Sequence, residues 1–146
     1  MLSGRSSSTA RRWNIAIIIV ILASVTFFGP LRKTSAMGLV IDEDSITVTG
    51  PSDAPFTLTV AYQDIRSISE TDSLDPGILL DGLDRNGCRF GSWQNAAYGE
   101  YMLCDIPDIP KHIVLETANG IVVFNYESAD FTHELCSAML SRLYGP

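Results

Sequence analysis

Basic residues are scarce in most of this chain. From residue 37 to the end, 17 acidic residues stand against 5 basic ones, which gives this part a net charge of −12. Such a charge repels nucleic acid and anionic lipid headgroups, so neither is expected to bind this surface. The acidity is most simply a property that keeps a domain soluble, and 146 residues leave room for one domain of ordinary size.

The sequence also lacks the short motifs of common catalytic sites. It has two histidines, His112 and His133, which do not form a His-Glu-x-x-His motif, and it has no Gly-x-Ser-x-Gly elbow or phosphate-binding glycine loop. Cys136 follows His133 by three residues, but it falls on the apolar side of a predicted helix, which favours a buried thiol over a nucleophile. We therefore expect a protein that is not an enzyme. A solvent-facing cluster of both histidines with a carboxylate would reverse that expectation.

Metal and cofactor sites are not expected either. The pairs Asp81/Asp84 and Asp105/Asp108 lack the dense oxygen ligands and the closing glutamate of an EF-hand calcium loop. Solvated turn residues are the simpler interpretation of all four carboxylates. The sequence thus predicts no cofactor and no metal.

Two arginines flank a predicted glycine-containing turn in the middle of the chain. Arg85 and Arg89 lie on either side of Gly87 and are isolated positive charges in an acidic domain. An anion could bind them, but pairing with nearby carboxylates such as Asp81 or Asp84 is the simpler expectation.

Charged residues are absent from Trp13 to Leu31, a stretch rich in Ile, Val and Phe. As a helix these residues would span about 28 Å, close to the thickness of a bilayer's hydrocarbon core. Trp13 stands where an interfacial aromatic residue is common. The sequence therefore predicts a short tail, a transmembrane helix that acts as a signal anchor, a linker and one globular domain, at 1–12, 13–31, 32–37 and 38–144.

The orientation and processing of this segment stay open. Three arginines precede it, whereas Arg32 and Lys33 follow it. This bias weakly favours an orientation in the cell membrane with the N-terminus on the inner side and the domain on the outer side. In the alternative, a signal peptidase cleaves near Ala36 and releases a secreted or periplasmic domain that binds a small ligand or lipid.

Short alternating runs indicate that the domain is mainly β. "SITVT" at 45–49 and "FTLTVAY" at 56–62 alternate apolar with polar residues, and Asn119-Gly120 between two β-rich runs is a strong hairpin signal. The last residues change to a helical period after Ser128, a predicted N-cap. The sequence predicts an antiparallel β-sandwich or partly open barrel of about seven strands, closed by one C-terminal amphipathic helix.

The order of these segments resembles the bacterial pleckstrin-homology-like (PH-like) domains over about residues 39–143. The resemblance rests on "IDEDSITVTG" followed by "FTLTVAYQDIRSI", on "HIVLETANGIVVFNYESADFTHEL", and on the fold-motif residues Arg85, Gly87, Gly99, Asn119 and Gly120 in "RNG", "YGEY" and the last hairpin. One departure is "DIPDIP", whose prolines interrupt the strand expected there.

The resemblance implies a protein-interaction or scaffold module, not a catalyst. No Lys or Arg occurs between Lys33 and Arg66, where eukaryotic relatives bind phosphoinositides, so that role is not expected here. We expect a single-pass membrane protein whose partner is another membrane or envelope protein. The candidate contact is the loop from Gly91 to Gly99, and the candidate interaction residues are Arg89, Phe90, Trp93, Tyr98 and Tyr101.

The two cysteines of "NGCRFGSWQNAAYGEYMLCD" would face each other in a hairpin centred on Ala96. In that register Cys88 lies opposite Cys104, within reach of a disulfide. Two thiols are too few for a structural zinc site, and the Cys-x-x-Cys spacing of redox enzymes is absent. If the domain faces an oxidising compartment, we expect a Cys88–Cys104 disulfide and a free Cys136. In the cytoplasm all three would be reduced.

Overall fold

The computed structural model describes residues 37–51, 55–85 and 87–145. The expected N-terminal tail, transmembrane segment and cleavage site lie outside these residues. Within these ranges, no helix is both long enough and apolar enough to cross a bilayer.

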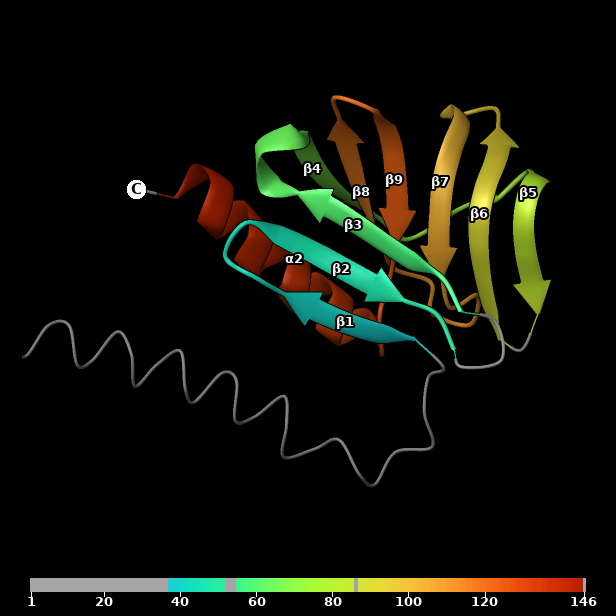
Figure 1. The fold of residues 1–146 in the computed structure, drawn as a ribbon, viewed down its shortest axis with the longest axis horizontal. Helices are drawn as coiled ribbons and strands as arrows, with labels where there is room; N and C mark the ends of the chain where they lie inside the picture. Colours follow the sequence, from blue (N-terminus) through green and yellow to red (C-terminus); the bar gives the residue numbers. More distant parts are fainter. Residues whose placement is uncertain (1–36, 52–54, 86, 146) are drawn as a thin grey trace, which may run out of the picture. The chain divides into compact units, whose positions relative to one another are not determined.

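The described residues form nine strands and one long C-terminal helix (Figure 1). The expectation of a mainly β domain with one C-terminal helix is confirmed, although the strands outnumber the seven expected. A short 3₁₀ helix, η1, joins two of the strands. The elements are β1 (Gly38–Ile41), β2 (Ser45–Thr49), β3 (Thr57–Ala61), η1 (Tyr62–Asp64), β4 (Ile65–Thr71), β5 (Ile78–Arg85), β6 (Cys88–Asn95), β7 (Gly99–Asp105), β8 (His112–Thr117), β9 (Gly120–Phe124) and α2 (Ala129–Tyr144).

The strands form two sheets. The smaller has the order β1-β2-β3 and the larger the order β4-β8-β9-β7-β6-β5. All neighbours are antiparallel except β7 and β9, which run parallel, whereas an antiparallel arrangement throughout was expected. The segment 106–111 explains the difference, because its two prolines lack backbone donors and carry the chain out of the sheet. The chain re-enters two positions away as β8, and β9 then returns beside β7.

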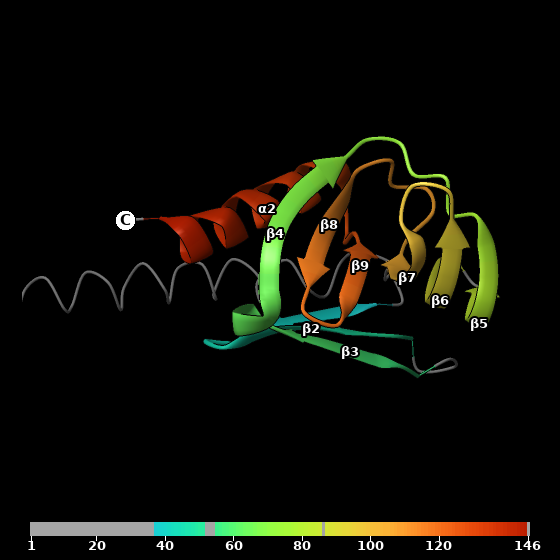
Figure 2. The same ribbon diagram turned by 90° about the horizontal axis from the view of Figure 1, so that it is seen from above.

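The main hydrophobic core lies on the face of the large sheet that the small sheet covers. Figure 2 shows the small sheet along this side and α2 next to β4. Strands of both sheets and the apolar face of α2 contribute buried side chains, among them Ile46, Val48, Val60, Ile113, Leu115, Phe124, Leu135 and Met139. Cys88, Cys104 and Cys136 are buried in the same cluster.

The entry to α2 follows the local sequence. Ser128 is the N-cap, and its hydroxyl accepts a hydrogen bond from the backbone N–H of Phe131 at 3.1 Å. Asp130 lies in the first turn, where the helix dipole favours a negative charge. The predicted cap residue of the C-terminal helix is therefore confirmed.

The β6–β7 hairpin forms, but its expected centre is wrong by one residue. Asn95 pairs with Gly99 and Phe90 pairs with Cys104, so the hairpin is centred on Ala97. The amide oxygen of Asn95 accepts a hydrogen bond from the backbone N–H of Tyr98 at 2.7 Å, and Gly99 follows with a φ of 69°. The left-handed residue directly after this three-residue turn is thus glycine, which adopts a positive φ most easily.

The corrected register makes Cys88 and Cys104 diagonal neighbours on one face instead of a directly opposed pair. Both are free thiols in the structure, and the sulfhydryl of Cys88 donates to the carbonyl oxygen of Arg85 at 3.5 Å. A diagonal pair is farther apart than a direct one, which makes a disulfide harder to close. The disulfide expected in an oxidising compartment stays a prediction.

Candidate functional site

The face of the large sheet that points away from the small one carries a second, smaller hydrophobic cluster. Its buried members are Trp93, Tyr101, Leu103, Val114 and Val123, with Leu74, Leu79, Tyr98 and Ile121 packed against them. The segment between β4 and β5 runs across this side (Figure 2). Tyr101 fixes that segment, because its hydroxyl donates to the carbonyl oxygen of Pro76 at 2.9 Å.

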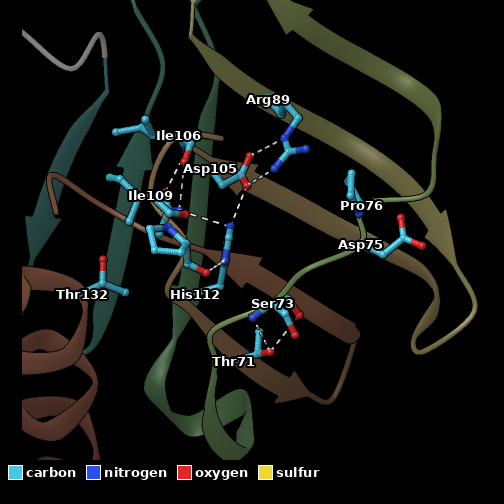
Figure 3. A network of polar contacts seen from close by, with 12 residues as sticks. Thr71, Ser73, Asp75, Pro76, Arg89, Asp105, Ile106, Ile109, His112 and Thr132 are labelled. Atoms are coloured by element: carbon cyan, nitrogen blue, oxygen red, sulfur yellow. Dashed lines mark hydrogen bonds and ion pairs between the residues drawn. The ribbon is translucent and has the colours of Figure 1, made fainter. Parts of the chain in front are cut away.

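A buried ion pair lies at one end of this outer face. Asp105, the last residue of β7, is fully buried, and Arg89 of β6 donates to both of its carboxylate oxygens (Figure 3). The distances are 2.8 Å from Nε to Oδ1 and 2.5 Å from Nη2 to Oδ2. Burial disfavours ionisation of Asp105, but hydrogen bonds and positive charge from His112 and Arg89 outweigh it and hold the pKa of this carboxyl below its usual range.

His112, the first residue of β8, joins this ion pair to the loop after β7. Its Nε2 lies 2.7 Å from Oδ2 of Asp105, and its Nδ1 lies 3.0 Å from the carbonyl oxygen of Pro110 (Figure 3). Because a carbonyl oxygen can only accept, Nδ1 must carry a proton. Nε2 also lies 3.2 Å from the side-chain nitrogen of Asn125. Both ring nitrogens are thus occupied by protein groups.

Asn125, the residue after β9, holds the proline-containing loop in place. Its amide oxygen accepts from the backbone N–H of Ile106 at 2.7 Å. Its amide nitrogen donates to the carbonyl oxygens of Ile106 and Ile109, both at 3.1 Å. The side chain is fully buried and has three partners on one loop, so it fixes the shape of "DIPDIP".

A half-open pocket of about 640 Å³ borders the ion pair. Three segments far apart in sequence form its walls: the β4–β5 connection, the β6–β7 turn and the β7–β8 loop. Arg89 and His112 also line it, together with Asp72, Ser73, Leu74, Asp75, Asn95, Ala96, Ala97, Tyr98, Pro107, Ile109 and Pro110. Because Asp105 uses only Nε and Nη2 of Arg89, Nη1 remains outside that ion pair.

The structure separates the five residues named as interaction candidates. Arg89 and Tyr98 line the pocket, whereas Trp93 and Tyr101 are buried beneath the β4–β5 segment. Phe90 points to the opposite face and stacks on Phe56, with ring centroids 3.7 Å apart. Most of the expected loop from 91 to 99 is strand β6, and only 96–98 is turn.

The fold-motif residues lie at strand ends and turns. Arg85 ends β5, and Gly87 has a φ of 73° in the turn to β6. The predicted hairpin between β8 and β9 forms, but its turn is Ala118-Asn119, one residue before the predicted Asn119-Gly120, and Gly120 begins β9 opposite Thr117 with a φ of 125°. These residues shape the chain and do not line the pocket beside Arg89.

The two histidines do not meet. His133 lies on α2 and contacts Glu70 of β4, with Nδ1 2.9 Å from Oε1, whereas His112 belongs to the Asp105 network. Lys111 lies 3.5 Å from Glu70 and 2.6 Å from Asp72, which makes it part of a surface ion-pair group. These side chains therefore do not form the cluster of both histidines with a carboxylate that would have favoured an enzyme.

Cys136 is a buried core residue, as its place on the apolar stripe predicted. Burial and the nearby carboxylate of Glu70 raise the pKa of its thiol to about 11. Of the four carboxylates considered for calcium, Asp81, Asp84 and Asp108 are exposed. Among the residues that the structure describes, no group of three or more His, Cys, Asp or Glu side chains is placed to hold a metal.

Comparison with known proteins gives no assignment: no protein-family model matches the chain, and neither a curated protein nor a solved structure does. Function must therefore be argued from the geometry of the described residues and from the pattern of the sequence. The pocket beside Arg89 and His112 is the feature on which that argument rests.

Proposed function

We propose that this chain is a non-enzymatic, single-pass membrane protein whose PH-like domain binds a protein partner through the pocket beside Arg89 and His112. The partner is another membrane or envelope protein. The uncharged segment 13–31 supports the anchor, and the resemblance of 39–143 to bacterial PH-like domains supports the interaction role.

The observation that carries the proposal is how the pocket is built. Its walls come from three separate segments. The contacts of His112 and Asn125 fix the β7–β8 loop to the sheet, and Tyr101 holds the β4–β5 connection through the carbonyl oxygen of Pro76. Loops held on a rigid β scaffold are common binding sites, because a preformed surface loses little entropy when a partner docks. A volume of about 640 Å³ is enough to take several side chains of a partner.

The same network argues against acid–base chemistry. A general base needs a lone pair that faces the substrate, but both ring nitrogens of His112 are occupied by Pro110, Asp105 and Asn125. Asp105 is likewise occupied by Arg89 and His112 and is fully buried. Asp105 and His112 are therefore better suited to holding the β7–β8 loop in one conformation.

A crosslinking experiment tests the proposal. A photoreactive amino acid at Ala97, in the pocket wall, should yield a discrete adduct to one protein in native membranes. The same amino acid at Glu134, exposed on α2, is the matched control and should yield none. Adding Tyr98→Ala should weaken the adduct at 97. Absence of an adduct at 97, or equal adducts at both positions, would contradict the proposal.

A second candidate function has one observation in its favour. A groove of about 430 Å³ lies where β3 approaches β7 and β9, and Leu58, Val60, Met102 and Val122 are among its lining residues. Its apolar side chains would suit a small apolar ligand carried by a domain released after cleavage near Ala36. N-terminal sequencing of the mature protein separates the two, because a new N-terminus at Met37 excludes the anchor.

A further inference from the structure

Strand β5 forms one edge of the large sheet. Within the described ranges it pairs with β6 alone, so the backbone groups on its other side have no strand partner. An unpaired edge can accept a further strand from another chain, and proteins usually protect such edges.

The opposite edge of the same sheet is protected. Helix α2 packs against β4, and the hydroxyl of Tyr144 donates to the backbone carbonyl oxygen of Arg66 on that strand at 3.1 Å. Figure 2 shows α2 beside β4 at one end of the sheet and β5 at the other. Among the described residues, a helix thus covers one edge of the sheet and no helix covers the other.

The first half of β5 exposes apolar side chains. Ile78 is 68 % exposed, more than any other large hydrophobic residue in the described part of the chain, and Leu80 is 48 % exposed. The features that usually protect an edge begin at Leu80, which lies in the bulge between Leu79 and Asp81. They continue with the charge of Asp81 and with Gly82. The open part of the edge is therefore its start, next to the β4–β5 segment.

The charge of this edge selects among partners. Asp81 and Asp84 are exposed on β5, and the chain from residue 37 onward has a net charge of −12. A second copy of this chain would bring the same excess of negative charge to the contact. A segment rich in Lys or Arg would instead be attracted.

We propose that the edge of β5 binds an extended, basic segment of a partner protein by β-strand addition. Apolar side chains of that segment pack beside Ile78 and Leu80, and its Lys or Arg side chains reach Asp81 and Asp84. Backbone hydrogen bonds provide much of the affinity, while side chains at alternate positions provide the selectivity. This surface is separate from the pocket, and it does not depend on what the pocket binds.

Two peptides of about ten residues test this inference, one alternating Lys with Val and the other Glu with Val. The full chain in detergent should bind the Lys peptide at least about tenfold more tightly in fluorescence anisotropy. Hydrogen exchange should slow at the amides of 78–80. The double variant Ile78→Lys/Leu80→Lys should weaken this binding by at least about tenfold.

The matched control is Val40→Lys/Ile41→Lys on β1, which adds the same charge at residues that are 50 % and 49 % exposed. It should leave binding unchanged. If both double variants lose the same affinity for the Lys peptide, the binding is general charge attraction and the inference is overturned. Absence of binding would also overturn it, as would a dimer of this chain that disappears in Ile78→Lys/Leu80→Lys. Failure of the crosslink at Ala97 would affect the pocket proposal only.

Discussion

Arg89 and Asp105 form a two-point ion pair across neighbouring strands, with Nε 2.8 Å from Oδ1 and Nη2 2.5 Å from Oδ2. The pairing positions match, since Arg89 lies directly opposite Asp105 in the β6–β7 register. The carboxylate of Asp105 also contacts Nε2 of His112, so it is the common partner of residues from β6 and β8. The start of the β7–β8 loop, and with it one wall of the pocket, depends on this carboxylate.

Asp105→Asn should destabilise the domain by about 3 kcal/mol. The substitution removes the negative charge and leaves Arg89 and His112 without their common partner, and breaking one side of a buried ion pair is costly. Urea unfolding followed by circular dichroism measures the change. Asp108→Asn in the same loop is exposed and should change stability by less than about 0.5 kcal/mol. Similar small effects for both variants would contradict this role of Asp105.

The ion pair should also make the stability of the folded domain depend on pH in the acidic range. The pKa of Asp105 is lowered in the folded state, so the unfolded chain binds this proton more readily. The stability that results is fully present above about pH 4, the usual pKa of aspartate, and is lost as pH falls through the lower folded value. Other carboxylates titrate in the same range. The readout is therefore the difference in melting temperature between wild type and Asp105→Asn, which should shrink from about pH 5 downward. A difference that stays constant with pH would count against the assignment.

Asn125→Ala should loosen the β7–β8 loop. The substitution removes three hydrogen bonds to Ile106 and Ile109 and leaves buried backbone groups without partners, at a cost of about 1 kcal/mol or more for each. Hydrogen exchange at the amide of Ile106 should accelerate, and urea unfolding should show a loss of about 3 kcal/mol. Gln94→Ala, at an exposed position on β6, is the control and should change neither readout. Unchanged exchange at Ile106 would contradict the anchoring role.

The elements that were predictable from sequence depend on signals within a few residues. Ser128 marks the helix start where expected, and Asn119-Gly120 marks a hairpin whose turn lies one residue earlier than predicted. The hairpin at 88–104 was predicted as well. Its register, however, depends on a hydrogen bond from the backbone N–H of Tyr98 to the side-chain oxygen of Asn95, which the sequence pattern does not reveal.

The candidate site was harder to predict, because it depends on contacts between distant segments. Arg89 was expected to pair with Asp81 or Asp84 across the nearest turn, whereas its partner is Asp105 on the next strand. Asn125 carried no signal beyond its position after an apolar strand. Only the parallel pairing of β7 with β9 brings Asn125 beside the β7–β8 loop, and that pairing follows from the proline-containing crossover.

The thiols should be unreactive in the folded domain. Burial raises the pKa of Cys104, with a smaller contribution from Asp105, and the pKa of Cys136 is raised to about 11, so neither forms a thiolate readily near neutral pH. A colorimetric thiol reagent should find no rapid reaction in the native protein. After unfolding, the reagent should detect three thiols if the domain comes from a reducing compartment. It should detect one thiol if Cys88 and Cys104 form a disulfide. Rapid labelling of Cys136 in the native state would contradict its burial.

The glycine at position 82 should be much less replaceable than the one at position 120. Both have positive φ values, 136° and 125°, so alanine is strained at either position by about 1 kcal/mol or more. A Cβ at Gly82 would in addition overlap the carbonyl oxygen of Phe90 on β6, whereas nothing lies within 4 Å of a Cβ at Gly120. Gly82→Ala should therefore cost at least about 2 kcal/mol more than Gly120→Ala in urea unfolding, since the clash is with backbone. Because β5 pairs with β6 alone, Gly82→Ala should also accelerate hydrogen exchange along 78–85 and weaken binding of the Lys peptide. Equal costs for the two variants would mean that β5 can shift away from β6 freely, which would also remove the rigid edge that strand addition needs.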